Sequence, residues 1–142
     1  MPETTLTIRV PFLPPNINRH SRNWYTTRHA DQEYAGLVCL SAIDARNRWE
    51  VQHGTRWLTL PHARIEVYFR TNAERGPLPD THNLYAGKGL KAAIDRLTDR
   101  HYSGCGLFRD DSPTCLEWGL MRPCERGEAN ETRITITEAF EG

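Results

Sequence analysis

Residues 62–70, HARIEVYFR, carry the clearest strand pattern in the chain. Apolar residues alternate there with polar or amphipathic ones, so the apolar side chains fall on one face of an extended segment. A repeat of two residues is typical of a half-buried β-strand. The apolar positions are Ala63, Ile65, Val67 and Phe69. This segment predicts a sheet that has one face buried under a second layer.

Two more segments show the same alternation, residues 5–10 (TLTIRV) and residues 133–137 (RITIT). Residues 114–121 are a further candidate strand. The first strand is followed by three prolines within five residues, and the polar, turn-rich stretch 16–28 predicts a loop.

Two other segments have helical spacing. Residues 31–48 repeat apolar residues at intervals of three and four, and the acidic Asp31 and Glu33 suit a first helical turn. Residues 90–100 form the second predicted helix, with one apolar face. Gly87 and Gly89 argue against regular helix before residue 90.

Strands and helices do not alternate regularly along the chain. We therefore predict a small α+β fold, with a mixed β-sheet and two main helices packed on it. A chain of 142 residues and 16.4 kDa is one domain's worth of polymer, so residues 1–142 are expected to form a single domain.

Composition indicates a cytoplasmic protein without membrane contact. No apolar run approaches the ~20 residues of a membrane span, and the N-terminus lacks an apolar signal core. Cysteines stand at positions 39, 105, 115 and 124, without the paired spacing of a zinc site. We expect four reduced thiols.

The net charge of zero excludes a uniformly basic nucleic-acid clamp, but the charge is unevenly distributed. Residues 1–109 carry 15 basic and 10 acidic side chains, whereas residues 110–142 carry 3 and 8. Sixteen of the 18 basic residues are arginine, the better bidentate partner for phosphate. Codon bias explains most of this arginine excess, while the positive first part favours an anionic partner.

Candidate chemistry is carried by Asp80 and by the pair Asp110-Asp111. The helix between them is short, so the chain can return and bring Asp80 and Asp111 together. Meeting carboxylates repel each other and need a cation, and Mg²⁺ is held by one or two carboxylates plus phosphate and water. Such a site activates water for phosphodiester hydrolysis. The alternative is structural: Asp80 caps the turn before the helix, and the pair is solvated in a loop.

Basic residues near these acids are suited to phosphate. Lys91 begins the second predicted helix and is a candidate to neutralise a phosphate, or else a plain surface lysine. Asn18, Arg19 and Arg22 lie in the polar loop, and their side chains are suited to contacts with the phosphate backbone of DNA. The alternative is a loop packed down by its own aromatic residues.

These motifs, taken in order, resemble the RusA family of Holliday junction resolvases, small enzymes of bacteria and their phages. The resemblance rests on Pro14-Pro15-x-x-Asn18-Arg19, Asp80-x-His82-Asn83-Leu84, the helix KAAIDRL from Lys91, and Asp110-Asp111. It spans about residues 5–138. It implies a homodimeric, Mg²⁺-dependent endonuclease with a RusA-like α+β fold that cuts four-way DNA junctions by paired nicks. It also implies metal-binding roles for Asp80 and Asp111 and a catalytic or phosphate-contacting role for Lys91.

The chain departs from the family pattern at three points. His82 stands where the family usually has a second aspartate, and histidine suits Mn²⁺ and other transition metals better than Mg²⁺; we expect it as a third metal ligand or a water-orienting group. The stretch before Lys91 is longer than usual and contains Lys88, which is an alternative catalytic lysine. Pro79 replaces the basic residue that commonly precedes the first aspartate, and Arg70 or Arg75 is expected to supply that charge.

Two functions follow as hypotheses. The first is a metal-dependent, structure-selective endonuclease of branched DNA, with Mg²⁺ as cofactor and Mn²⁺ as a possible substitute. The second is a branched-DNA-binding protein of the same fold that does not cut, because His82 weakens the metal site. An interaction protein without any nucleic-acid role is a third possibility.

Overall fold

The computed structural model describes residues 4–15 and 24–140. Within these residues, the chain forms a five-stranded mixed sheet and three helices, which confirms the predicted α+β class. The strands are β1 (Thr5–Val10), β2 (Ala63–Thr71), β3 (Leu116–Trp118), β4 (Glu125–Arg126) and β5 (Glu131–Glu138). The helices are α1 (Trp24–His53), α2 (Thr81–Ala86) and α3 (Lys88–Asp95).

The sheet has the strand order β1-β5-β2-β3, and β4 pairs with β2 beyond the end of β3. Strand β5 is antiparallel to both β1 and β2, whereas β3 and β4 run parallel to β2. A parallel pair requires a crossover connection, and here α2 and α3 provide it between β2 and β3. This crossover determines where the candidate acids lie.

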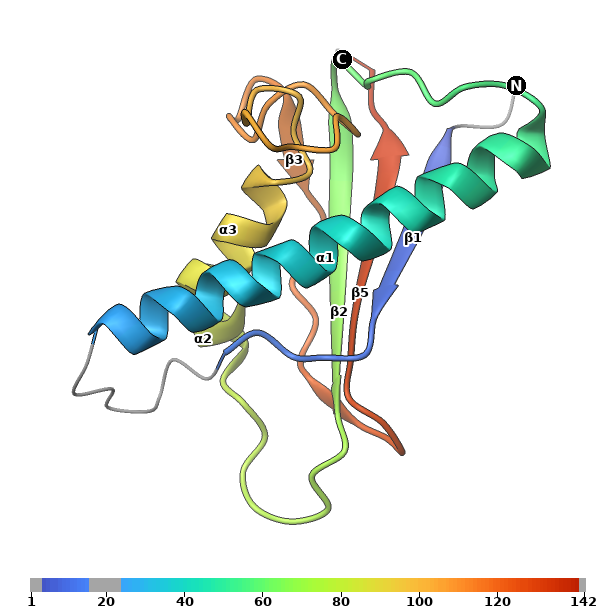
Figure 1. Cartoon of the computed structure of the whole chain (residues 1–142). Helices are drawn as coiled ribbons and strands as arrows, with labels where there is room; N and C mark the ends of the chain where they lie inside the picture. The colour runs from blue at the N-terminus through green and yellow to red at the C-terminus, as the bar shows by residue number, and fades with distance from the viewer. Residues whose placement is uncertain (1–3, 16–23, 141–142) are drawn as a thin grey trace.

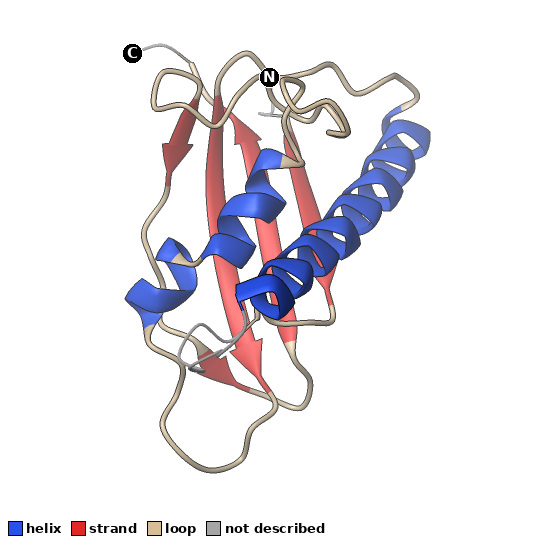
Figure 2. Cartoon of the chain, turned by 60° about the vertical axis from the view of Figure 1, so that its left-hand side comes forward, coloured by secondary structure: helices blue, strands red, loops and turns tan. Residues whose placement is uncertain are grey.

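The helices gather on one side of the sheet (Figure 2), and α1 runs obliquely across that face (Figure 1). Buried and more exposed residues alternate along β1 and β2, as the sequence pattern predicted. The largest fully buried side chains include Phe69, Phe108, Ile8, Ile65 and Ile134. The residues that alternate with the buried ones in β1 and β2 point to the opposite, helix-free face of the sheet.

The first helix is longer than predicted and begins at Trp24 instead of residue 31. Residues 24–28, expected in a loop, are therefore helical. No proline interrupts the chain between residues 16 and 60, so nothing stops the helix from extending toward its N-terminus. Asp31 consequently does not lie in the first turn but is buried. Helix α1 ends at His53, and Gly54 follows it with a φ of +66°, which suits a glycine after a helix C-terminus.

The second predicted helix is also shifted. Helix begins before residue 90, as two pieces separated at Gly87, and ends at Asp95 instead of residue 100. Gly89 lies inside α3, where a Cβ atom would come within 2.9 Å of Pro15 Cδ and 3.1 Å of Asp31 Oδ1. Glycine is favoured there by close packing, which outweighs its low helix propensity.

Strand β3 is shorter than the candidate strand at residues 114–121, and β4 was not predicted.

All four cysteines are free thiols, as expected. None of the helices in the described ranges combines the length and apolarity that crossing a bilayer demands.

Candidate functional site

Asp80 begins the candidate site, at the N-terminus of α2. Its Oδ1 accepts a hydrogen bond from the Asn83 backbone N–H at 3.1 Å, which makes Asp80 the N-cap of the helix. The structural interpretation of Asp80 is therefore correct. It does not exclude a second role, because Asp80 is exposed and a carboxylate oxygen accepts more than one partner.

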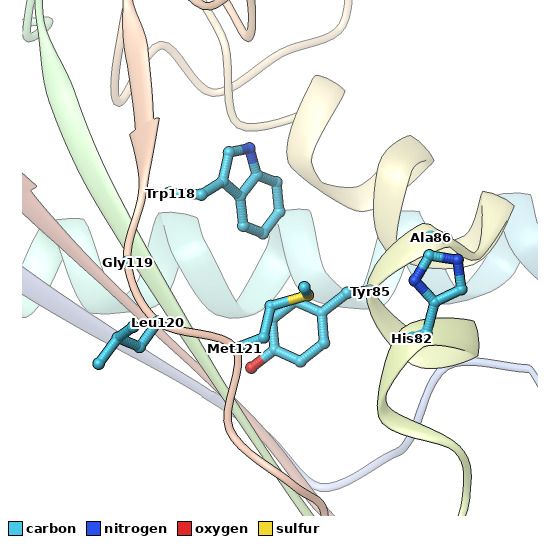
Figure 3. A pocket seen from close by; sticks show the side chains of 7 residues that line it. All are labelled: His82, Tyr85, Ala86, Trp118, Gly119, Leu120 and Met121. Carbon is cyan, nitrogen blue, oxygen red and sulfur yellow. The ribbon is translucent and has the colours of Figure 1, made fainter.

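His82 is exposed on the first turn of α2 and lines a pocket of about 480 Å³. The other walls come from Tyr85 and Ala86 of α2 and from residues 118–121, which include the end of β3. Figure 3 shows His82 and Trp118 on opposite sides of this space, with Tyr85 and Met121 between them. The candidate histidine thus faces an apolar hollow.

The start of α3 brings together parts of the chain that are distant in sequence. Lys88 and Lys91 both lie in the first turn of α3 and are exposed. Asp31, from α1, lies close to Gly89, and Pro14 and Pro15 pack against the same glycine. The Pro-Pro motif of the resemblance therefore meets the stretch that joins the Asp80–Leu84 motif to the helix from Lys91.

Asp31 is the acid that sequence reasoning missed. It is 5% exposed, and its Oδ1 has no hydrogen-bond partner among the described residues. Burial raises the pKa of the Asp31 carboxyl, and the nearby charge of Lys88 offsets part of that rise. This contact distinguishes the two lysines, because Lys88 has a neighbouring carboxylate on α1. The sequence carried no signal for it.

Asp110 and Asp111 lie at the other end of α3. Partial burial tends to raise the pKa of Asp110, but hydrogen bonds from the Asp111 N–H and from Arg100 outweigh it and lower that pKa. Burial, a hydrogen bond with Asp110 and the charges of Asp95 and Asp110 raise the pKa of Asp111. Asp95, Asp110 and Asp111 therefore form a negatively charged region, in which ionisation of Asp111 is unfavourable.

The crossover keeps Asp80 and Asp111 apart within one chain. Asp80 caps the start of α2, whereas Asp111 neighbours Asp95, the last residue of α3. The eight residues of α3 alone span about 12 Å, and Mg²⁺ holds its oxygen ligands at about 2.1 Å. Figure 1 shows the segment after α3 at the end of that helix remote from α2. The expectation that a short return helix brings the two acids together does not hold for a single protomer, because α2 and α3 extend along the sheet.

The described ranges contain no group of three or more His, Cys, Asp or Glu side chains that could hold a metal ion.

The predicted DNA-contacting residues lie in different surroundings. Arg70 pairs with Glu131 at 3.0 Å on the helix-free face of the sheet. Arg75 is exposed in the loop that leads to Asp80. Asn18, Arg19 and Arg22 lie outside the described residues.

The pocket beside His82 was not anticipated from the sequence. Trp118, Leu120 and Met121 are 43%, 88% and 56% exposed, which is unusual for three large apolar residues so close in sequence. The signal that could have located them is the run WGLM directly after a short candidate strand.

Comparison with known proteins adds no family to this description. The chain matches no protein-family model, and it matches none of the curated proteins.

Proposed function

We propose that this protein is a metal-dependent endonuclease that cuts branched DNA, in the manner of a Holliday junction resolvase, and acts as a homodimer. The observation that carries the proposal is the meeting of the Pro14-Pro15 segment with the Asp80–Lys91 segment at the start of α3. Pro14-Pro15 is part of one motif on which the family resemblance rests, and Gly89, which it meets, lies between two others, Asp80 to Leu84 and the helix from Lys91. This proximity supports the proposal, because the fold brings segments together that are about 75 residues apart in the sequence.

The residues at this point suit the backbone of a nucleic acid. Lys88 and Lys91 are exposed side by side in the first turn of α3, where backbone N–H groups and the helix dipole also favour an anion. Lys91 is proposed to contact the phosphate next to the cut. Lys88, held near Asp31, is the alternative.

The proposed metal site needs two protomers. In a two-fold dimer the same surface occurs twice, in opposite orientation, so the Asp80 end of one protomer can adjoin the Asp111 end of the other. Asp80 and His82 together with Asp111 of the partner subunit would then supply the ligands for Mg²⁺ or Mn²⁺. A divalent cation bound there would offset the repulsion that raises the pKa of Asp111.

The test uses a synthetic four-way junction, radiolabelled on each strand, incubated with Mg²⁺ or Mn²⁺. We expect paired nicks near the branch from the wild-type protein and none from the Asp80→Asn variant. Asparagine caps a helix as well as aspartate does, so this change removes the charge without disturbing α2. Circular dichroism of both proteins checks that point.

Two results would contradict the proposal. Continued nicking by the Asp80→Asn variant would show that Asp80 is not a metal ligand of the nuclease site. Tight junction binding without nicking in either metal would favour the branched-DNA-binding protein that does not cut.

A further inference from the structure

The pocket beside His82 is built mainly of aromatic and apolar side chains. Its lining consists of His82, Tyr85, Ala86, Trp118, Gly119, Leu120 and Met121, and no carboxylate is among them. Its volume of about 480 Å³ lies in the range of small-molecule sites. Two planar walls come from different elements, since Trp118 belongs to β3 and Tyr85 to α2.

The walls of the pocket are held in place by the protein's own contacts. The Tyr85 hydroxyl donates to the Val67 carbonyl and accepts from the Arg122 N–H at 3.2 Å, and its ring meets that of Trp118 edge-on at 6.3 Å. The Trp118 indole nevertheless remains 43% exposed. A large ring left half in solvent beside a preformed hollow is suited to stacking on a planar ligand.

The pocket lies next to the candidate site at the start of α2. His82 lies two residues from Asp80, on the same first turn of α2. On the other side, the chain continues from Met121 into Arg122. The guanidiniums of Arg122 and Arg133 lie 5.4 and 4.6 Å from the Tyr68 ring centre, on the helix-free face of the sheet and away from the pocket. An apolar, flat-walled hollow beside the proposed cutting site suits the flat face of a nucleic-acid base.

We propose that this pocket takes one unstacked DNA base from the branch point, stacked on Trp118. The inference rests on the proposed function and adds a base-binding position to it. Bases at a branch lose a stacking neighbour, so they cost less to extrude than bases within a duplex. Stacking on an aromatic side chain is sequence-tolerant, because every base has a flat face. The pocket would thus recognise the shape of the branch rather than a sequence.

A second copy of the chain is the competing occupant of the pocket. A stable interface buries about 800 Å² on each partner. Trp118, Leu120 and Met121 are only three side chains, and the residues on either side of them, Glu117 and Arg122, are charged and exposed. The size and rim of the patch therefore favour a small planar group.

The test is a double-mutant cycle between Trp118 and the base. Junction affinity is measured by fluorescence anisotropy in EDTA, so that no strand is cut. The junctions are intact or carry one abasic site, placed in turn on each of the four strands at the branch. We expect that Trp118→Ala weakens binding of the intact junction by about 30-fold, the middle of the range for base stacking. For at least one abasic position, the wild type loses a similar factor and Trp118→Ala loses nothing more.

Three controls accompany the cycle. Trp118→Phe keeps a ring and is expected to retain most of the affinity. Phe140→Ala removes another exposed aromatic ring, 72% exposed and outside the pocket, and is expected to change nothing. Thermal melting of Trp118→Ala verifies that the fold persists.

Several outcomes would overturn the base pocket. The first is that, at all four abasic positions, Trp118→Ala and the abasic site reduce junction affinity independently, so that their effects multiply. The second is that the wild type does not bind the junction. The third is that Trp118→Ala converts the protein from a dimer to a monomer. Nicking by the wild type is scored separately. If Trp118 and the abasic site are coupled but the wild type does not nick the junction, the base pocket is supported and the endonuclease proposal is wrong. If the wild type nicks the junction but shows no such coupling, the endonuclease proposal is supported and the base pocket is wrong.

Discussion

The carboxylates of Asp80 and Asp111 have different effects on the stability of the fold. Asp80 accepts the Asn83 N–H and so stabilises the start of α2. Partial desolvation, a hydrogen bond with Asp110 and the charges of Asp95 and Asp110 raise the pKa of Asp111. An ionised group that the fold makes unfavourable is a feature of functional sites, where stability is given up for chemistry.

Replacing Asp111 by asparagine is expected to stabilise the protein at neutral pH. Because the folded-state pKa of Asp111 is raised, its stabilising contribution is complete below the unfolded-state pKa and is lost as pH rises through the folded-state value. At pH 7 the Asp111→Asn variant should therefore melt at a higher temperature than the wild type. Near pH 3, below the ordinary aspartate pKa of about 3.9, the two melting temperatures should converge.

The control for this prediction is Glu128→Gln, an exposed residue between β4 and β5 whose loss of charge should have little effect on melting. A melting temperature of Asp111→Asn equal to or below that of the wild type at pH 7 would show that Asp111 is not electrostatically strained.

His82 permits a test of metal preference. Carboxylate oxygen suits Mg²⁺, whereas imidazole suits transition metals. The change His82→Asp should therefore raise nicking in Mg²⁺ by more than it raises nicking in Mn²⁺, measured as initial rates on the same junction. Equal or lower rates in both metals would argue against His82 as a ligand.

At the level of elements, the packing of α3 depends on close approach to α1 and to the Pro14-Pro15 segment. Gly89 provides the space, since its position is crowded by Pro15 and Asp31. Gly36, inside α1, is different: the nearest atom to a Cβ there is Arg96 Nη1 at 3.8 Å, an ordinary contact. The two helical glycines thus form a matched pair.

Alanine should act in opposite directions at these two glycines. Gly36→Ala is expected to stabilise the protein by up to about 1 kcal/mol, the difference in helix propensity. Gly89→Ala is expected to destabilise it by about 1–3 kcal/mol through overpacking. Urea denaturation of both variants measures the free energy of unfolding. Equal stabilisation by both changes would show that α3 does not pack tightly on Pro15 and Asp31.

At the level of the whole molecule, the parallel crossover places the two sets of candidate acids at opposite ends of α2 and α3. The proposed dimer makes each metal site from two protomers. This arrangement predicts complementation between two variants, Asp80→Asn and Asp111→Asn, that are inactive alone. In a mixed dimer one site carries both changes, and the other site carries neither.

Co-expression of the two variants should therefore restore nicking to about a quarter of the wild-type level, because about half of the dimers are mixed and each has one intact site. The assay is the four-way junction in Mg²⁺ or Mn²⁺, with each variant alone as the control. No recovery in a mixture shown to contain mixed dimers would mean that both acids act within one chain.

The fold class followed from local patterns. Alternation in residues 5–10, 62–70 and 133–137 predicted strands that the structure contains, because burial of one sheet face imposes a period of two on each strand. Element ends were less predictable: α1 begins at Trp24, and α3 includes Gly89. Tertiary packing overrides weak propensities at such points.

The sequence by itself determined the α+β class, the strands that form the sheet, and the residue types available for chemistry. Only the tertiary structure decided which of those residues meet. Strand β3 pairs parallel to β2, so the chain must travel the length of α2 and α3 before it returns, and this path separates Asp80 from Asp111 while it brings Pro15 and Asp31 to Gly89. The exposed ring of Trp118 beside His82 has the same origin, because the contact between the end of β3 and α2 exists only in the folded chain.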